Sequence, residues 1–495
     1  MDVLFVVEDV RHHSPIGMMQ VSAIAKQRGD QTHLGVLSRE DVLNKIDKLK
    51  PNVVAYGGST GEHKFYERFN SKLKQRHPEI FTVMGGTHAT FFPEIMKDAK
   101  LDAVVVGEGE QAFKELLDRV ERGEDVSGLQ NVRTHSQPET TLRPLIQDLD
   151  SLPFPDRSLF FENTENGQAP IKHFMASRGC PYKCSYCFNS PFKGMYPGEK
   201  YVRRHSVGYV LEEILDTLSD YPAEFIKFYD DVLTFRVDDW LREFAQRYKQ
   251  EVGLSFYCLT RADLMTEEMA KLLKEAGCQT VQMAAESTND RIRNELLHRN
   301  MTKEQMKKAF KICADKGMTV VTNYILGLPG STVQDDIDAV YFNIEAGVPV
   351  PEFPIFQPYP GTELGDLCVR EGWFDGDFDS IHTSYNNRSP LNCFNEEEKD
   401  IHANINRLGQ IATTCARDHP SITNLIMNHL IHQRGENEAF ARAYTEHKWE
   451  LYNRLVYPFK HSEETKQEML GKSLRLGVSD RTDEVKPIPQ ADSTT

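Results

Sequence analysis

Three cysteines lie within eight residues of one another: Cys180, Cys184 and Cys187, with three and then two residues between them. Soft thiolates on one short loop can converge on one metal centre. Structural zinc takes four ligands, often as two separated pairs, but the sequence has no second pair and no histidine at ligand spacing nearby. A 4Fe-4S cluster fits three thiolates better, because its fourth iron stays open to a substrate or a cofactor. Zinc, or three buried cysteines without metal, are the alternatives.

The chain around this loop has an ordinary globular composition. It has 495 residues, of which 39% are hydrophobic and 27% charged. At roughly 150 residues per domain, this length predicts about three domains. The 58 Lys and Arg residues are outnumbered by 74 Asp and Glu residues, which gives a net charge of −16. This balance argues against a nucleic-acid or anionic-membrane partner, and no apolar run reaches the roughly 18 residues of a membrane span.

Nine cysteines, with acidic residues rather than a basic segment at the start of the chain, predict a cytoplasmic protein in which the thiols stay reduced. Six of them are scattered, and we expect each to be dispensable for the metal centre: Cys258, Cys278, Cys313, Cys368, Cys393 and Cys415.

The cysteine loop opens a series of alternating strands and helices. The predicted strands are His173–Ala176, Phe225–Tyr229, Leu254–Leu259, Thr280–Ala284, Thr319–Tyr324 and Glu352–Gln357. The predicted helices include Val207–Leu218, Val237–Tyr248, Glu267–Glu275, Lys303–Asp315 and Val333–Glu345. Six such units are too few for an eightfold barrel but sufficient for a partial (β/α)6 barrel.

An earlier series of the same kind occupies the first 120 or so residues. Its predicted strands are Val3–Val7, Thr32–Leu37, Asn52–Tyr56, Phe81–Met84 and Ala103–Val106. Buried-type strands that alternate with helices predict a parallel, Rossmann-like sheet covered on both faces. Glycine-rich turns follow the last three strands, on the edge where such sheets bind ligands. Each turn is also compatible with a tight strand-to-helix connection and no ligand.

The predicted organisation is α/β throughout. It has an N-terminal domain over residues 1–125, a linker over 126–169, a barrel over 170–370 and a helical C-terminal region over 371–470. The last residues, 471–495, are rich in charge, Pro, Ser and Thr, and are predicted to be disordered.

The segment Arg178-Gly179-Cys180-Pro181-Tyr182-Lys183-Cys184-Ser185-Tyr186-Cys187 resembles the radical S-adenosylmethionine (SAM) superfamily. This resemblance implies that SAM chelates the open iron and is cleaved to a 5′-deoxyadenosyl radical. It also implies that Tyr186 lies against the adenine.

Four later segments carry the resemblance as far as about residue 370. Asp231 ends Lys227-Phe228-Tyr229-Asp230-Asp231, where the superfamily places polar groups that face the SAM amino group. Glu286 ends the fourth strand within Ala284-Ala285-Glu286-Ser287, which resembles a Gly-Ile-Glu-Ser element whose glutamate contacts SAM. Gly327 and Pro329 resemble the Gly-x-Pro-Gly turn near the adenine. Tyr359-Pro360-Gly361-Thr362 resembles a further recurrent turn.

A Rossmann-like domain before this core resembles the cobalamin-binding radical SAM enzymes, the branch with anaerobic magnesium-protoporphyrin ester cyclase and many methyltransferases. The resemblance implies a cobalamin site formed by the turn residues Ser59, Gly85, Gly86, Thr87, Gly107, Glu108 and Gly109. The Asp-x-His-x-x-Gly motif of proteins that ligate cobalt through histidine is absent from residues 8–17. Cobalamin without a histidine ligand is therefore expected, and a domain that binds no cobalamin is the alternative.

The function implied by the resemblance is a cobalamin-dependent radical SAM methyltransferase acting on an unactivated carbon of a small molecule. One SAM methylates the cobalamin, a second generates the radical, and a donor such as flavodoxin or ferredoxin supplies electrons. The alternatives are an anaerobic cyclase or rearrangement enzyme that uses the same cofactors, and a non-catalytic cofactor-binding protein. No motif identifies the substrate.

Overall fold

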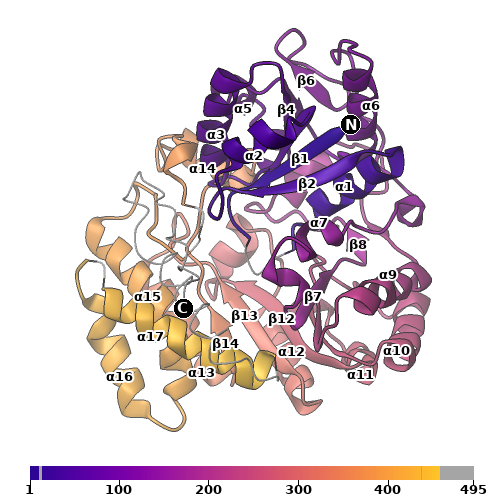
Figure 1. Ribbon diagram of the computed structural model, residues 1–495. Helices are drawn as coiled ribbons and strands as arrows, with labels where there is room; N and C mark the ends of the chain where they lie inside the picture. The colour runs from indigo at the N-terminus through magenta and orange to yellow at the C-terminus, as the bar shows by residue number, and fades with distance from the viewer. Residues whose placement is uncertain (11–13, 383, 385, 436, 458–495) are drawn as a thin grey trace, which may run out of the picture.

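The N-terminal part of the chain folds around one six-stranded sheet (Figure 1). The computed structural model describes residues 1–10, 14–382, 384, 386–435 and 437–457. In spatial order, its strands are β2 (Gln31–Val36), β1 (Asp2–Val7), β3 (Val53–Gly57), β4 (Phe81–Gly85), β5 (Ala103–Val105) and β6 (Val132–Thr134). The first five are parallel and match the five predicted strands, while the unpredicted β6 pairs antiparallel to β5.

Helices cover both faces of this sheet, because successive residues of a buried strand point to opposite sides. Val3 and Phe5 of β1 belong to a core formed with α1 (Ile16–Arg28) and α6 (Glu110–Glu121). Leu4 and Val6 belong to a separate core on the other face. The helices of that second core are α2 (Val42–Leu49), α3 (His63–Arg76), α4 (Thr87–Phe91) and α5 (Ile95–Asp98).

The second part is an open barrel of six parallel strands. In spatial order they are β14 (Val350–Glu352), β13 (Thr319–Tyr324), β12 (Cys278–Glu286), β11 (Ser255–Thr260), β10 (Phe225–Phe228) and β7 (Ile171–Phe174). The expected strand Glu352–Gln357 is wrong in its bounds, since β14 ends at Glu352 and only an isolated bridge joins Ile355 to Leu326. Pro354 has no N–H with which to continue the ladder. Before β10, Ser177–Arg178 and Arg203–Arg204 form a short antiparallel ribbon, β8 and β9.

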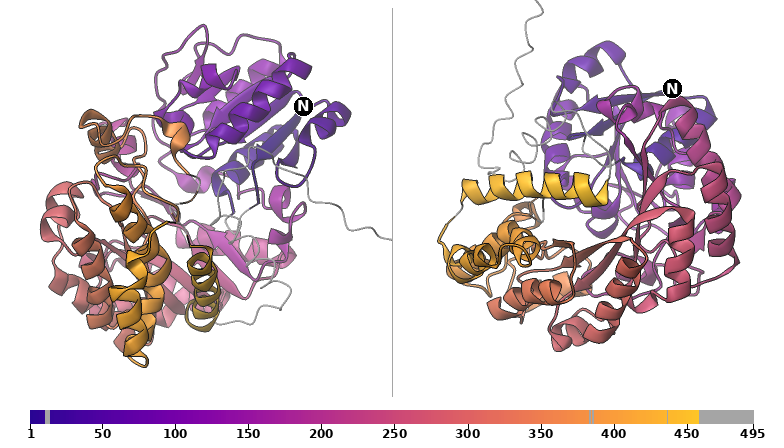
Figure 2. Two further views of the ribbon diagram at one scale, coloured as in Figure 1. Left: turned by 90° about the vertical axis from the view of Figure 1, so that its left-hand side faces the viewer. Right: turned by 90° about the horizontal axis from the view of Figure 1, so that it is seen from below.

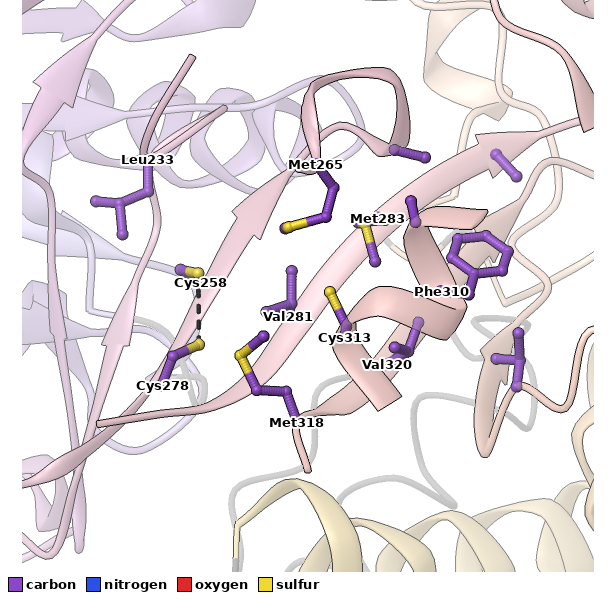
Figure 3. Packing of buried hydrophobic residues seen from close by; sticks show 14 of the residues in the cluster. Leu233, Cys258, Met265, Cys278, Val281, Met283, Phe310, Cys313, Met318 and Val320 are labelled. Atoms are coloured by element: carbon purple, nitrogen blue, oxygen red, sulfur yellow. Dashed lines mark hydrogen bonds between the residues drawn. The ribbon is translucent and has the colours of Figure 1, made fainter. Parts of the chain in front are cut away.

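Five helices cover the outside of the barrel: α9 (Val207–Asp220), α10 (Asp239–Glu251), α11 (Glu267–Ala276), α12 (Lys303–Asp315) and α13 (Val333–Glu345). Figure 3 shows one part of the hydrophobic core, where Phe310 and Cys313 of α12 lie over outward residues of the strands, and Cys258, Cys278 and Cys313 lie among methionine and valine side chains. The sulfurs of Cys258 and Cys278 lie 3.8 Å apart. These three cysteines belong to the hydrophobic core and lie apart from the predicted metal loop.

The C-terminal helices are α14 (Glu363–Arg370), α15 (Glu396–Cys415), α16 (Pro420–Asn428) and α17 (Glu438–Leu451) (Figure 2), and α15 packs against α13 and β14 of the barrel. Ile405 and Leu408 of α15 join the outer core. The turn after α17, Tyr452–Val456, lies inside, because Val456 packs with the inward residues Phe225 and Tyr257. Val456 accepts a hydrogen bond from the Thr280 hydroxyl at 3.1 Å. The C-terminal region therefore forms the floor of the barrel.

Two sequence predictions fall outside the described residues: the disordered tail at 471–495 and the absence of a cobalt ligand at His12 and His13. Within the described ranges, no helix has the length and apolar character needed to cross a membrane.

Candidate functional site

The cysteine loop follows β8 at the carboxyl edge of the barrel. Gly179, which precedes Cys180, has φ +85°, and a Cβ there would lie 2.7 Å from the Tyr201 carbonyl oxygen, so the turn requires glycine. Cys184 is buried, and Cys180 and Cys187 are half-buried. Burial raises the pKa of Cys180, and it raises the pKa of Cys187 to about 12. These thiols therefore stay protonated unless positive charge or metal stabilises the thiolates.

The loop does not preform a site for a single ion. Among the described residues, no three His, Cys, Asp or Glu side chains are arranged to hold one metal ion. The thiols are nevertheless neighbours, because Cys184 affects the pKa of both Cys180 and Cys187. In an iron–sulfur cube each thiolate binds a different iron, so the sulfurs need not converge on one point. The arrangement fits a cluster better than it fits zinc.

Two buried arginines flank Cys184, and the sequence analysis missed both. The guanidinium groups of Arg261 and Arg299 lie 3.9 and 3.8 Å from its sulfur. Arg261 is positioned by Asp263 at 2.9 Å and stacks over the ring of Tyr182. Positive charge beside a sulfur favours the thiolate form. Arg261 directly follows β11, so its place at a strand end was a usable signal, whereas no local pattern marks Arg299.

Glu286 lies against the residue that precedes the third cysteine. The Tyr186 hydroxyl donates a hydrogen bond to the Glu286 carboxylate at 2.6 Å. A register shift between Ala284 and Glu286 marks a bulge in β12, and Glu286 has φ +67°, which is uncommon for a residue other than glycine. Bulges of this kind re-aim a side chain. Burial raises the pKa of Glu286, and Arg299 opposes this shift.

Asp231 lies just beyond the end of β10, near two of the loop cysteines. It influences the pKa of Cys180 and Cys187, and its side chain is exposed at the strand end. The surrounding protein raises the pKa of Asp231, against a hydrogen bond from Asn189. The preceding Asp230 is fully buried and accepts the backbone N–H of Ala176 at 3.0 Å. Asp230 is therefore a structural residue, and Asp231 is the acid available to a ligand.

The turn with Gly327 and Pro329 follows β13 beside these residues. Ile325, two residues before Gly327, donates its backbone N–H to the Glu286 carbonyl oxygen at 2.9 Å. Gly327 has φ +61°, and a Cβ there would lie 3.0 Å from the ring of His402. Leu328 and the Tyr186 ring belong to one hydrophobic cluster. The structure thus brings Tyr186, Glu286 and this turn together at one side of the loop.

A cavity of about 740 Å³ lies at the carboxyl edge of the N-terminal sheet. All seven residues of the predicted cobalamin site line it: Ser59, Gly85, Gly86, Thr87, Gly107, Glu108 and Gly109. The cavity also reaches Met175, Ser177 and Arg178 of the barrel part. It therefore extends from the glycine turns to Arg178, which precedes Cys180 by two residues in the sequence. The glycines have no side chains to block it, so the backbone leaves room for a large, flat ligand such as a corrin.

Glu108 lines the cavity but is engaged by the other part of the chain. Its carboxylate accepts hydrogen bonds from Arg203 at 2.8 Å, from Arg178 at 3.2 Å and from the Ile146 N–H at 3.0 Å. Arg178 also pairs with the buried Glu110 at 2.6 Å. Glu108 and Glu110, which follow β5, thus hold the wall of the cavity against Arg178, the residue at which the cysteine loop begins.

His88, from the same turn as Thr87, is buried rather than solvated. Its ring stacks on His63 with a centroid separation of 3.9 Å, and its Nδ1 lies 3.0 Å from the Thr60 hydroxyl. His88 is not among the residues that line the cavity. His88 is therefore an interior residue that packs within the N-terminal domain and is closed off from solvent.

Replacing Arg178 by Met should destabilise the protein by about 3–5 kcal/mol, because the buried Glu110 loses its partner. Burial acts to raise the pKa of Glu110, but Arg178, together with a backbone hydrogen bond and Arg203, holds that pKa below its usual range. The pair is therefore stabilising above the unfolded-state pKa of about 4 and loses this effect as pH falls through the folded-state pKa. Thermal unfolding midpoints at neutral pH measure the loss.

The matched control is Arg122→Met, which breaks an exposed pair with Glu124. It should leave the unfolding midpoint nearly unchanged, because an exposed ion pair contributes little to stability. Equal shifts of the two midpoints would show that the Arg178 pair behaves as an ordinary surface contact.

Comparisons with known proteins agree with this geometry. Residues 4–117 match the B12 binding domain, and residues 175–341 match the radical SAM superfamily. The chain is 30% identical over 371 residues to an uncharacterized methyltransferase of Pyrococcus horikoshii, covering 72% of this chain and 78% of the relative. The chain belongs to the cobalamin-binding radical SAM enzymes. Its cofactors are a 4Fe-4S cluster, SAM and cobalamin.

Other relatives of this radical SAM enzyme catalyse different reactions. The cytidylyl-2-hydroxyethylphosphonate methyltransferase of Streptomyces wedmorensis is 28% identical, with 68% of this chain and 70% of the relative covered. The anaerobic magnesium-protoporphyrin IX monomethyl ester cyclase of Rubrivivax gelatinosus is 26% identical, with 66% and 60% covered. The methyltransferase TsrM from Kitasatospora setae has the same fold, with a TM-score of 0.64, 15% identity, and 96% and 99% of the two chains covered.

Proposed function

We propose that this enzyme is a methyltransferase that acts on an unactivated carbon of a small molecule. The observation that carries the proposal is the single cavity that joins the glycine turns of the cobalamin domain to Arg178, two residues before Cys180. When bound, the cluster and SAM supply radical initiation, and cobalamin supplies the methyl group. The chain itself has to hold these groups around one space from which bulk water is excluded.

We assign three sets of residues to the three cofactors: the cluster, SAM and cobalamin. Cys180, Cys184 and Cys187 bind the cluster, with Arg261 and Arg299 stabilising negative charge on Cys184. The SAM residues are Tyr186, Asp231, Glu286, Gly327 and Pro329. The cobalamin residues are Ser59, Gly85, Gly86, Thr87, Gly107, Glu108 and Gly109. Within the cobalamin set, Glu108 acts by positioning its loop, because arginines and a backbone N–H already occupy its carboxylate.

A reduced ferredoxin or flavodoxin is the proposed electron donor, since a cluster of this type needs a low-potential source. The described cysteines are all free, which suits a reducing compartment, and we place the enzyme in the cytoplasm.

The test is to incubate the reduced, cluster-loaded enzyme with SAM, with and without cobalamin, and to quantify two products. Methyl donation converts SAM to S-adenosylhomocysteine, and radical initiation releases 5′-deoxyadenosine. The proposal expects both products with cobalamin and no S-adenosylhomocysteine without it. Only 5′-deoxyadenosine under both conditions would favour an enzyme that cyclises or rearranges its substrate, as the magnesium-protoporphyrin relatives do.

Substituting Asp231 or Glu286 by Ala should weaken SAM binding by roughly ten- to a hundredfold and leave the cluster in place. Each change removes one charged hydrogen-bond acceptor beside the cysteine loop. Equilibrium binding of SAM to the oxidised, cluster-loaded protein measures the effect. Glu243→Ala, on an exposed face of α10, is the control and should bind SAM normally. Unchanged SAM affinity in either site variant would remove that residue from the assignment.

A further inference from the structure

The inward face of the barrel carries a row of polar side chains above the floor. Ile226, Cys258, Val281 and Val320 point outward into the hydrophobic core. The residues that alternate with them face the interior, since the side chains of a strand point in turn to opposite faces. These inward residues include Lys227 on β10, Tyr257 on β11, Gln282 on β12 and Asn323 on β13.

Most of the polar side chains in this row form hydrogen bonds with one another or with the C-terminal region. The Tyr257 hydroxyl donates to the Gln282 side-chain oxygen, and the Gln282 amide donates to Asn323 at 2.6 Å. Farther along, the Glu352 carboxylate accepts hydrogen bonds from Lys448 at 2.8 Å and from the Tyr452 hydroxyl at 2.6 Å. Glu352 and Lys448 therefore neutralise each other.

Lys227 is different. Its ammonium lies 4.8 Å from the ring centre of Tyr229 and 4.7 Å from that of Tyr257, and among the described residues it makes no hydrogen bond and no salt bridge. Burial, reinforced by Lys448 and partly opposed by the Glu352 carboxylate, lowers the pKa of Lys227 to about 8, so the amine is still largely charged at neutral pH. Two aromatic faces offset only part of the cost of burying a cation.

Residues beside Lys227 also connect the barrel interior to the cobalamin domain. Tyr229 packs on the ring of His173 at 4.7 Å, and His173 lies 3.2 Å from the hydroxyl of Ser14 in the cobalamin domain. Lys227 lies on β10 and precedes Asp231, which follows the end of that strand, by four residues. Lys227 therefore lies on the strand that leads to the edge of the barrel where the proposed SAM residue Asp231 is found.

We propose that Lys227 anchors an anionic group of the substrate, a carboxylate or a phosphonate, inside the barrel. The inference rests on the proposed function and narrows its substrate to an organic acid. The anion pairs with the ammonium, the tyrosine rings line the adjacent carbon skeleton, and the reacting carbon lies toward the strand ends.

The test uses three fluorinated probes with the cluster- and cobalamin-loaded enzyme, followed by fluorine NMR titration: 4-fluorobenzoate, 4-fluorophenylphosphonate and 4-fluorobenzamide. At least one anion should bind, and the neutral amide should bind much more weakly. Lys227→Met should weaken anion binding about ten- to a hundredfold and leave the amide unaffected, whereas Lys227→Arg should retain most of the affinity. The relative affinities of the two anions separate a carboxylate site from a phosphonate site.

Lys311→Met is the matched control, since Lys311 lies on the exposed face of α12. Cluster and cobalamin contents of every variant show that it has folded. The proposal is overturned if neither anion binds the unmodified enzyme, if the amide binds as well as the anions, or if Lys227→Met binds them unchanged. Because no turnover is required, these outcomes are independent of whether the enzyme transfers methyl groups.

Discussion

Replacing Cys180, Cys184 and Cys187 together by Ala will give a folded protein without a 4Fe-4S cluster and without SAM cleavage. All three belong to one loop and lie outside the hydrophobic clusters that hold the barrel, so their loss removes the thiolates and leaves the core intact. Iron and sulfide analysis after anaerobic reconstitution, together with the visible spectrum, measures the effect. Cobalamin uptake should be retained, because the cavity residues are unchanged.

Cys393→Ala is the control for this experiment. Cys393 is an exposed cysteine in the C-terminal region, and its loss should leave the iron content and the spectrum as they are in the unmodified enzyme. A triple variant that keeps its iron and its absorption would refute the assignment of the cluster to this loop.

Replacing Gly85 by Leu will abolish cobalamin binding and spare the cluster. Gly85 lines the cavity, and a Cβ there meets only Val105 atoms, at 3.9 Å or more, so the added side chain enters the cavity without a clash in the backbone. Gly86 is a poorer choice, because its φ is +97° and a Cβ would lie 2.7 Å from the Gly58 carbonyl oxygen. Absorption of bound cobalamin after gel filtration, and iron content, are the two measurements.

Gly208→Leu provides the matched control. Gly208 lies in α9, where a Cβ also has only ordinary contacts, the nearest at 3.7 Å, and it does not line the cavity. This variant should bind cobalamin and iron normally. If the Gly85 variant took up cobalamin as well as this control does, the cavity would not be the cobalamin site.

Periodicity and spacing predicted much of this architecture, because strands buried on both faces leave a strong local pattern. The five predicted N-terminal strands and the helices Lys303–Asp315 and Val333–Glu345 occur as expected. The strand expected at Glu352–Gln357 was displaced, since the regular ladder ends at Glu352, just before Pro354, and only an isolated bridge at Ile355 follows.

The parts that the sequence could not supply depend on contacts between distant segments. The bulge that turns Glu286 toward Tyr186 has no local signature, and the pairing of Arg299 with Cys184 joins residues more than a hundred positions apart. The floor of the barrel is a similar case, because Val456 meets Thr280 only after the whole barrel has formed. Lys227 was visible in the sequence, but its place between the rings of Tyr229 and Tyr257 was not.

The central claim is that one chain holds an iron–sulfur cluster and a cobalamin at a shared cavity between its two α/β parts. The most direct measurement is the content of iron, sulfide and cobalamin in protein reconstituted anaerobically and freed of unbound cofactor. The account predicts about four irons, four sulfides and one cobalamin per chain. A protein that acquires the cluster but takes up no cobalamin would contradict it.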